Sequence, residues 1–202
     1  MSSMKNKRFV ATTFFVALVL LQSFIPFLGS LPLGAFFLGA SVTIVPMTVV
    51  IAGLVLGTRS GLIVGLFWGL TSWVRNLSHP GTVGSLIFSN PITALVPRIL
   101  VGVMAGYLAT HLLKKYRSTW WTMFGLGALG AFLNTVLVIL STTVGFKILN
   151  VSSHGIPKDH LFSWLVGILA FNSGFEMIAN GILVMVIGGV LVKSLPDLRP
   201  SK

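Results

Sequence analysis

Long apolar stretches separated by short polar connections dominate this sequence. Hydrophobic residues make up 54% of the 202 residues and charged residues only 8%, with a mean hydropathy of +0.96. This composition leaves too little polar surface to cover a water-soluble globule, so we predict an integral membrane protein. A transmembrane helix needs about 20 mainly apolar residues. Stretches near this length or longer cover residues 9–26, 41–57, 60–76, 91–113, 119–145 and 161–193.

The character of these stretches constrains the architecture. Lipid offers the backbone no hydrogen-bond partner, so a chain that crosses a membrane folds either as helices or as a closed barrel. The stretches lack the alternation of apolar and polar residues that barrel strands show. We therefore predict an all-α membrane protein in which residues 1–202 form a single domain, a six-transmembrane-helix bundle.

The basic residues sort to one side of such a bundle. The chain has fourteen Lys and Arg against three Asp and Glu, a formal net charge of +11. Ten basic residues fall at the termini and on alternate connections: Lys5, Lys7, Arg8, Arg59, Lys114, Lys115, Arg117, Lys193, Arg199 and Lys202. The opposite connections hold only Lys147 and Lys158. Cytoplasmic loops carry the basic excess, so we predict cytoplasmic termini in a multi-pass protein of the cell membrane. We expect the basic residues to meet anionic lipid, and no nucleic acid.

The N-terminus has two interpretations. Basic residues at positions 5–8 precede an apolar run over 9–25, as they do in a signal peptide. The run is close to the length of a membrane span, however, and no convincing cleavage site follows it. We therefore expect a retained first helix.

The connections predicted to lie outside the membrane are 27–40, 77–90 and 146–160. The first contains no charged residue and several large apolar ones. Two roles stay open for it, an apolar lid folded back onto the bundle or a segment lying at the interface. The second connection contains Ser78, His79, Pro80 and Gly81, and this composition predicts an irregular loop.

Small residues recur four apart in several apolar stretches. Such rows let membrane helices approach closely. They occur at Gly61, Gly65 and Gly69, at Gly102 and Gly106, and at Thr13 and Ala17. Each row is either an internal packing seam or a surface that docks a partner subunit.

Arg98 is the most informative polar residue. A charged side chain in mid-membrane costs about 2.5–3.5 kcal/mol on insertion scales, so those that persist usually face a cavity or a partner. Arg98 follows Pro91 and Pro97, which free backbone groups and widen a pocket. Its guanidinium is suited to a carboxylate or phosphate. The competing interpretations are an arginine that extends to the interface or an internal pair with Glu176.

Other polar side chains fall in the outer and middle parts of the third to sixth stretches. They are Arg75, Asn76, Asn90, Asn134, Asn172 and Glu176. Asn172 and Glu176 share one helical face because they lie four residues apart. Arg75 at a helix end also suits an interfacial position, and Asn134 also suits a bond between helices. Together these residues predict a polar pocket that opens outward.

Several chemistries are absent from the sequence. With one deep acid, Glu176, there is no chain of carboxylates for proton relay or cation coordination. There is no phosphate-binding glycine loop, the four histidines lack the spacing of a zinc site, and the lack of cysteine excludes thiolate chemistry. We therefore predict a binding or transport protein that is not an enzyme and holds no metal or cofactor.

Four segments of the sequence, together with glycines at 65, 69 and 106, match a known pattern: 43–50, 56–61, 88–91 and 97–102. In these segments the chain resembles the substrate-binding S components of energy-coupling factor (ECF) vitamin transporters. Within the family the sequence is most similar to the pantothenate-specific subunits. The resemblance implies a six-helix fold with a pocket roofed by the first outer loop. It also implies a transmembrane coupling subunit and two cytoplasmic ATPases as partners, which would hydrolyse the ATP.

The resemblance also implies roles for particular residues. Family members commonly present two alanines four apart on the first helix to the coupling subunit, whereas here Phe15 follows Ala11 by four residues. Thr13 and Ala17 supply a small pair in a shifted frame. For pantothenate, Arg98 would take the carboxylate, and Asn134 and Asn172 the amide or hydroxyls. Asn76 or Asn90 would add a polar contact, Trp68 or Trp73 would cover some of the apolar part, and Glu176 would orient Arg98 or accept a hydroxyl. Open alternatives are an S component for riboflavin, which would favour a deeper aromatic slot, or for folate, where Arg75 would join Arg98, and a free-standing solute carrier.

Overall fold

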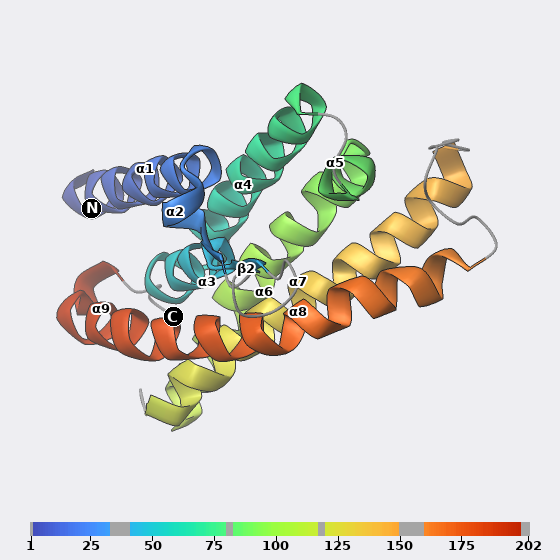
Figure 1. Cartoon of the computed structure of the whole chain (residues 1–202). Coiled ribbons are helices and arrows are strands. Elements are labelled where there is room, and N and C mark those ends of the chain that lie inside the picture. The colour runs from blue at the N-terminus through green and yellow to red at the C-terminus, as the bar shows by residue number, and fades with distance from the viewer. Residues whose placement is uncertain (1, 33–40, 80–82, 117–119, 150–159, 199–202) are drawn as a thin grey trace.

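The computed structural model describes residues 2–32, 41–79, 83–116, 120–149 and 160–198. Within them, each predicted apolar stretch contains a helix (Figure 1). The long helices are α1 (Ser2–Phe24), α3 (Val45–Leu56), α4 (Thr58–Ser78), α6 (Pro91–Tyr116), α7 (Trp120–Leu149) and α8 (Leu161–Leu183). The last continues through the π-helical turn η1 (Val184–Gly188) into α9 (Gly189–Ser194). Shorter elements are α2 (Pro26–Gly29), β1 (Ser30–Pro32), β2 (Ser41–Thr43), α5 (Val83–Phe88) and the 3₁₀ turn η2 (Pro196–Leu198).

Helices long and apolar enough to cross a membrane occur four times in the described part of the chain. They are Met4–Phe24, Pro91–Leu112, Trp120–Gly145 and Asn172–Ser194. This confirms a helical membrane protein, to which the structure adds one small two-stranded sheet, β1 paired antiparallel with β2.

Helix α3 occupies the centre of the molecule. Its twelve residues are all buried, and at about 1.5 Å per residue it is roughly 18 Å long, well short of the hydrocarbon core. A helix that is apolar on every side belongs inside a protein. The predicted stretch 41–57 is longer than α3 because residues 41–43 pair with β1.

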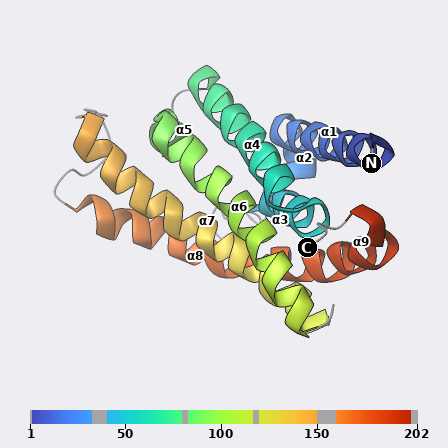
Figure 2. The same ribbon diagram turned by 180° about the vertical axis from the view of Figure 1, so that it is seen from behind.

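The glycine rows form the seam between α4 and α6. The two helices run side by side (Figure 2). A Cβ placed on Gly61 would overlap the backbone carbonyl of Gly102, and a Cβ on Gly65 would overlap that of Arg98. Backbone therefore packs directly on backbone, and these rows are internal packing seams.

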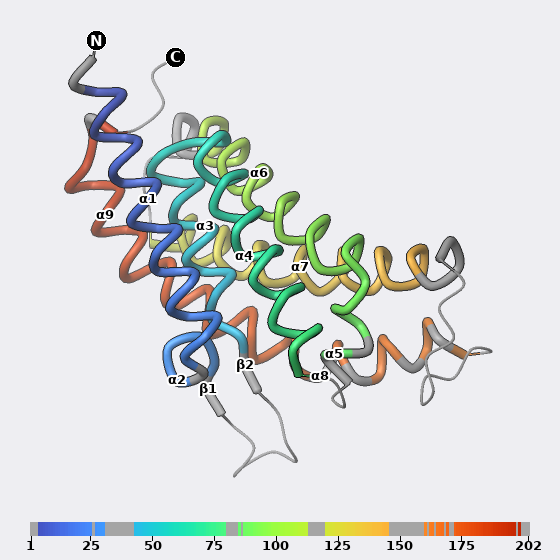
Figure 3. Tube along the Cα trace, turned by 90° about the horizontal axis from the view of Figure 1, so that it is seen from above, coloured from blue at the N-terminus to red at the C-terminus, as the bar shows by residue number. Residues whose placement is uncertain are grey.

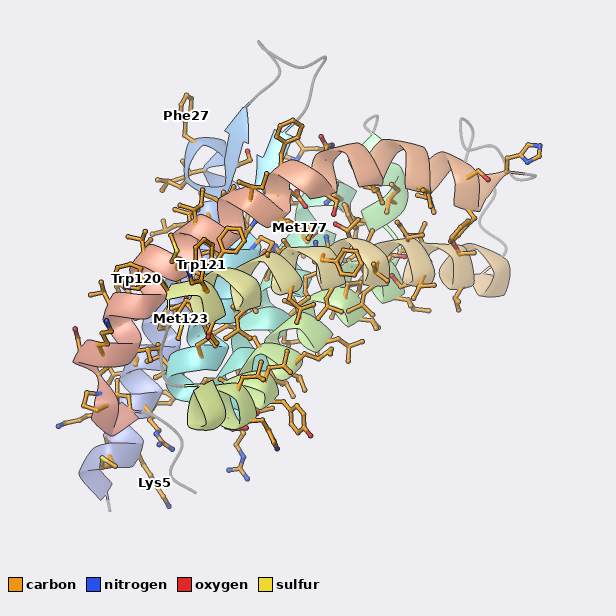
Figure 4. The ribbon with its side chains drawn as sticks, turned by 90° about the horizontal axis from the view of Figure 1, so that it is seen from below. Lys5, Phe27, Trp120, Trp121, Met123 and Met177 are labelled. Carbon is orange, nitrogen blue, oxygen red and sulfur yellow. The ribbon has the colours of Figure 1, made fainter. Side chains whose placement is uncertain are left out.

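The ends of the elements sort to two ends of the molecule. The first turns of α1 lie beside α9, whereas β1, β2 and α5 lie at the opposite end (Figure 3). Figure 4 shows the same separation along α1, with Lys5 at one end and Phe27 beyond the other.

The connections between helices carry more structure than the sequence predicted. The prediction of an irregular loop over 77–90 was wrong for α5. Ile87 of α5 is 2% exposed and belongs to an apolar cluster with Val138, Ile139 and Leu165, so burial of Ile87 holds the segment against α7 and α8. In the connection 27–40, α2 and β1 precede residues 33–40. Those residues lie outside the described part of the chain, so the lid remains a prediction.

Candidate functional site

Arg98 is held in the interior by its own helix. Proline has no backbone N–H, so Pro97 leaves the carbonyl of Thr93, four residues earlier, without its helical donor. Arg98 Nη1 donates a hydrogen bond to that carbonyl oxygen at 2.8 Å. The side chain is only 4% exposed, which argues against an arginine that extends to the membrane interface.

Aromatic rings flank the Arg98 guanidinium. Its central carbon lies 4.2 Å from the ring centroid of Phe88 and 5.2 Å from that of Trp68. Cations are attracted to the faces of such rings, and more strongly where water is excluded. The guanidinium is thus positioned before any ligand arrives, and its Nε has no hydrogen-bond partner among the described residues.

Glu176 lies near enough to Arg98 for their charges to interact. Its Oε1 accepts a hydrogen bond from the Thr43 N–H at 3.0 Å, while Arg98 donates to Thr93. Each charged group therefore has its own backbone partner. Through this bond Glu176 connects the polar interior to β2, at the end of the connection 27–40.

Asn180 strengthens the same connection and is fully buried. Its Oδ1 accepts from the Met47 N–H at 2.8 Å, and its Nδ2 donates to the carbonyl oxygens of Thr43 at 3.0 Å and Glu176 at 2.8 Å. We call Thr43, Met47, Glu176 and Asn180 the hairpin latch. It fixes β2 and the start of α3 to α8.

Several buried polar atoms in the described part of the chain have no hydrogen-bond partner. They are Asn90 Nδ2, Thr93 Oγ1, Asn134 Oδ1, Thr142 Oγ1 and Asn172 Oδ1, in addition to Arg98 Nε. Leaving such an atom unpaired costs about 1–3 kcal/mol. These atoms come from α6, α7, α8 and the residue before α6, and α7 packs against both α6 and α8. Unpaired buried groups on adjoining helices indicate a site for a polar ligand or ordered water.

The structure separates the predicted site residues into two groups. Arg98 and Trp68 are in contact, and Asn90, Asn134, Asn172 and Glu176 are inward-facing groups on or beside the neighbouring helices. Arg75 is exposed, and its Nη1 donates to the Ser23 carbonyl oxygen of α1 at 2.9 Å. Asn76 Nδ2 donates to Ser72 of its own helix at 2.7 Å. The partners of Arg75 and Asn76 thus lie on α1 and α4.

The sequence interpretation did not include Phe88, Thr93 or Thr142. Phe88 was quoted only as part of a segment, and threonine in an apolar helix usually bonds its own backbone. The signal available for Thr93 was its spacing of four residues from Pro97.

The site holds a cation, Arg98, and an acid, Glu176, beside neutral amides and hydroxyls, with aromatic walls. Such a set can bind an organic anion that also carries neutral polar groups and an apolar portion. The charge of the anion would be matched by Arg98, and its uncharged groups by the asparagines and threonines.

Comparison with known proteins gives the same class. Residues 7–188 match the family described as "ECF transporter, substrate-specific component". The chain is 48% identical to the pantothenate transporter PanT of Leuconostoc mesenteroides subsp. mesenteroides over 195 residues, 95% of each chain. It is 31% identical to the pantothenic acid transporter PanT of Lactococcus lactis subsp. cremoris over 168 residues, 75% of this chain and 78% of the relative. The resemblance found in the sequence is confirmed: the chain belongs to the substrate-specific components of ECF transporters.

Proposed function

We propose that this chain captures pantothenate at the outer face of the cell membrane for an ATP-driven ECF uptake transporter. The observation that carries the proposal is the buried guanidinium of Arg98, held against two aromatic rings, with an Nε that has no hydrogen-bond partner within the described ranges. The identity of 48% with a pantothenate transporter over nearly the whole chain supports the choice of ligand. Both termini would lie in the cytoplasm, with six helical segments in the membrane.

The ligand's functional groups suit the residues in the site. Pantothenate has one carboxylate, one amide, two hydroxyls and a gem-dimethyl group. Arg98 would bind the carboxylate, because a buried anion needs a charged partner. The side-chain amides of Asn134 and Asn172 would bind the central amide, since each can both donate and accept. Trp68 and Phe88 would cover the apolar portion.

Glu176 and Asn90 keep supporting roles in this proposal. Glu176 would tune the field at Arg98 while it anchors β2 through the Thr43 N–H. Asn90 would add a donor at the outer end of α6. We leave Arg75 and Asn76 out of the proposed site because their hydrogen bonds go to α1 and α4.

The exposed face of α1, which is turned away from the other helices, is the proposed docking surface for the coupling subunit. Thr13 and Ala17, the small pair of the shifted frame, are both exposed there. Val10, Phe14 and Leu21 on the same helix expose half or more of their surface. Beside this face a groove of about 1270 Å³ runs between α1, α3 and α9 and is lined mainly by apolar side chains, including Val10 and Phe14 but neither Thr13 nor Ala17. Two cytoplasmic ATPases would supply the ATP hydrolysis.

Residues at the start of α7 and in α9 support the proposed orientation, in which both termini lie in the cytoplasm. The Nζ of Lys193 lies 5.5 Å from the ring centroid of Trp120. Trp120 and Trp121 begin α7 and are exposed (Figure 4). Tryptophan is enriched at membrane–water interfaces and lysine on the cytoplasmic side.

The test is direct identification of the ligand. Mass spectrometry of small molecules retained by the purified protein should find pantothenate. Calorimetric titration with pantothenate, riboflavin and folate should give saturable binding for pantothenate alone. Tighter binding of riboflavin or folate would replace the proposed ligand and leave the family assignment intact.

A further inference from the structure

Asn90 is oriented by the start of α6. Its Oδ1 accepts a hydrogen bond from the Ile92 N–H at 2.9 Å, and its backbone oxygen accepts from the Ala94 N–H at 3.0 Å. Because the amide oxygen is engaged in this cap, the network settles which side-chain atom is which. The Nδ2 is therefore the group directed away from the cap. It is buried and has no hydrogen-bond partner among the described residues.

Gly145 brings the backbone of α7 against this amide. An ideal Cβ on Gly145 would lie 2.5 Å from Asn90 Nδ2 and 3.5 Å from Thr93 Oγ1. A side chain here would thus displace Asn90. Because Gly145 has no side chain, Asn90 and Thr93 both lie against the backbone of α7, where α6 and α7 pack together.

Thr142 shares this face of α7 with Gly145. Residues three apart on a helix are neighbours on its surface, and Thr142 precedes Gly145 by three residues. Both Thr142 and Thr93 are fully buried, and neither hydroxyl has a hydrogen-bond partner in the part of the chain that the structure describes.

The hydroxyl of Thr142 behaves differently from others on the same helix. Thr135, Ser141 and Thr143 each donate to a carbonyl oxygen of their own preceding turn. This local bond is the usual solution for a hydroxyl in an apolar helix. Thr142 does not make it. Its oxygen is left available on the face that meets Asn90 and Thr93.

We propose that Asn90, Thr93 and Thr142 form a neutral subsite that binds a hydroxyl group of the ligand, while Arg98 binds its carboxylate. This inference rests on the proposed function. A carboxylate placed among these three uncharged side chains would be buried without a counter-charge, which is costly. A ligand hydroxyl suits them, because it can accept from Asn90 Nδ2 and donate to a threonine oxygen. We name the three residues the hydroxyl subsite.

The experiment separates the two ends of the ligand by pairing protein variants with ligand analogues. Pantothenate, pantothenyl alcohol, in which a primary alcohol replaces the carboxylate, and a pantothenate analogue without hydroxyls are titrated by calorimetry. The proteins are the full-length wild type, Thr142→Val, Thr93→Val and Arg98→Ala. Valine matches the shape of threonine and removes only the hydrogen bond.

We expect Thr142→Val and Thr93→Val each to weaken binding of pantothenate and of pantothenyl alcohol roughly five- to tenfold. Neither variant should change the affinity for the analogue without hydroxyls. Arg98→Ala should show the opposite pattern, with a loss for both ligands that keep the carboxylate and none for the alcohol. Thr142→Ser should restore affinity because it restores the hydroxyl.

The controls distinguish the two proposals. Thr143→Val, the adjacent residue whose hydroxyl bonds Ile139, should bind all three ligands as the wild type does. Two results would overturn the hydroxyl subsite while the proposed function stands. One is a loss of affinity in Thr142→Val and Thr93→Val only for the ligands that carry the carboxylate, and the other is no loss of affinity in either variant. Failure of the wild type to bind pantothenate overturns both.

Discussion

Arg98 carries the charge recognition of the proposed site, so its removal should be costly. A hydrogen bond to a charged group contributes about 1.5–3 kcal/mol. We therefore expect Arg98→Ala to weaken pantothenate binding roughly ten- to a hundredfold in calorimetric titration. Arg59→Ala is the matched control, because Arg59 is exposed in the first turn of α4. Unchanged affinity in Arg98→Ala would exclude Arg98 from the site.

Residues differ in how far the sequence reveals their role. The buried position of Arg98 was predictable, because a charge in an apolar stretch needs a reason and Pro97 marked the backbone group that it satisfies; its role in binding stays a prediction. The unpaired hydroxyl of Thr142 in the described structure was not predictable, because the sequence does not show whether a threonine bonds its own helix or faces a neighbour. Arg75 is also a charge in an apolar stretch, but it lies at the end of that stretch, and its hydrogen bond to Ser23 depends on where α1 packs.

At the scale of elements, the hairpin latch makes a prediction about stability. Asn180→Ala would remove the hydrogen bonds of its side chain to the Met47 N–H and the Thr43 carbonyl oxygen, each worth about 0.5–1.5 kcal/mol. The Met47 N–H would keep its bond to the Ile44 carbonyl oxygen at 3.1 Å, and the Thr43 N–H its bond to Glu176. We expect a lower midpoint of thermal unfolding and faster ligand release, because β2 and α3 would be held to α8 less firmly. Asn172→Ala is the comparison on the same helical face. Its Oδ1 has no partner in the described structure, so it should affect binding more than unfolding.

The glycine seam between α4 and α6 gives a second prediction at this scale. A methyl group on Gly102 would overlap the backbone of Gly61, which cannot move without separating the helices. We expect Gly102→Ala to lower the free energy of unfolding by at least about 1–3 kcal/mol. Gly125→Ala is the matched control, since nothing lies within 4 Å of its Cβ position. Equal thermal midpoints for the two variants would contradict the close backbone contact.

Elements were easier to predict than their ends. Hydropathy located the six principal helices, because membrane insertion depends on summed apolar character. It did not locate β2 or α5. The pairing of residues 41–43 with β1 and the burial of Ile87 depend on segments far apart in the chain. Hydropathy also could not show that α3 is enclosed by other helices.

At the scale of the whole molecule, ligand capture and transport should be separable. In the proposed function, capture would require only the interior of this chain, whereas transport would require the coupling subunit and ATPases. Vesicles that contain this chain alone should bind pantothenate without accumulating it, and addition of the ECF module with ATP should produce uptake. Accumulation by the chain alone would identify a free-standing carrier.

A substitution on the exposed face of α1 that carries Thr13 and Ala17 should also separate ligand capture from transport. A tryptophan at Ala17 would project from an exposed position on α1, away from the buried side chains of the site. We expect Ala17→Trp to retain the wild-type affinity for pantothenate in titration. It should lose most ATP-dependent uptake in the reconstituted complex, because α1 and the helices of the coupling subunit could no longer approach closely. Leu129→Trp is the control, since Leu129 is an exposed apolar residue on α7, and its uptake should be preserved. If Ala17→Trp supports normal uptake, the coupling subunit docks on another face of the bundle. If it loses pantothenate binding, α1 supports the ligand site as well as the interface.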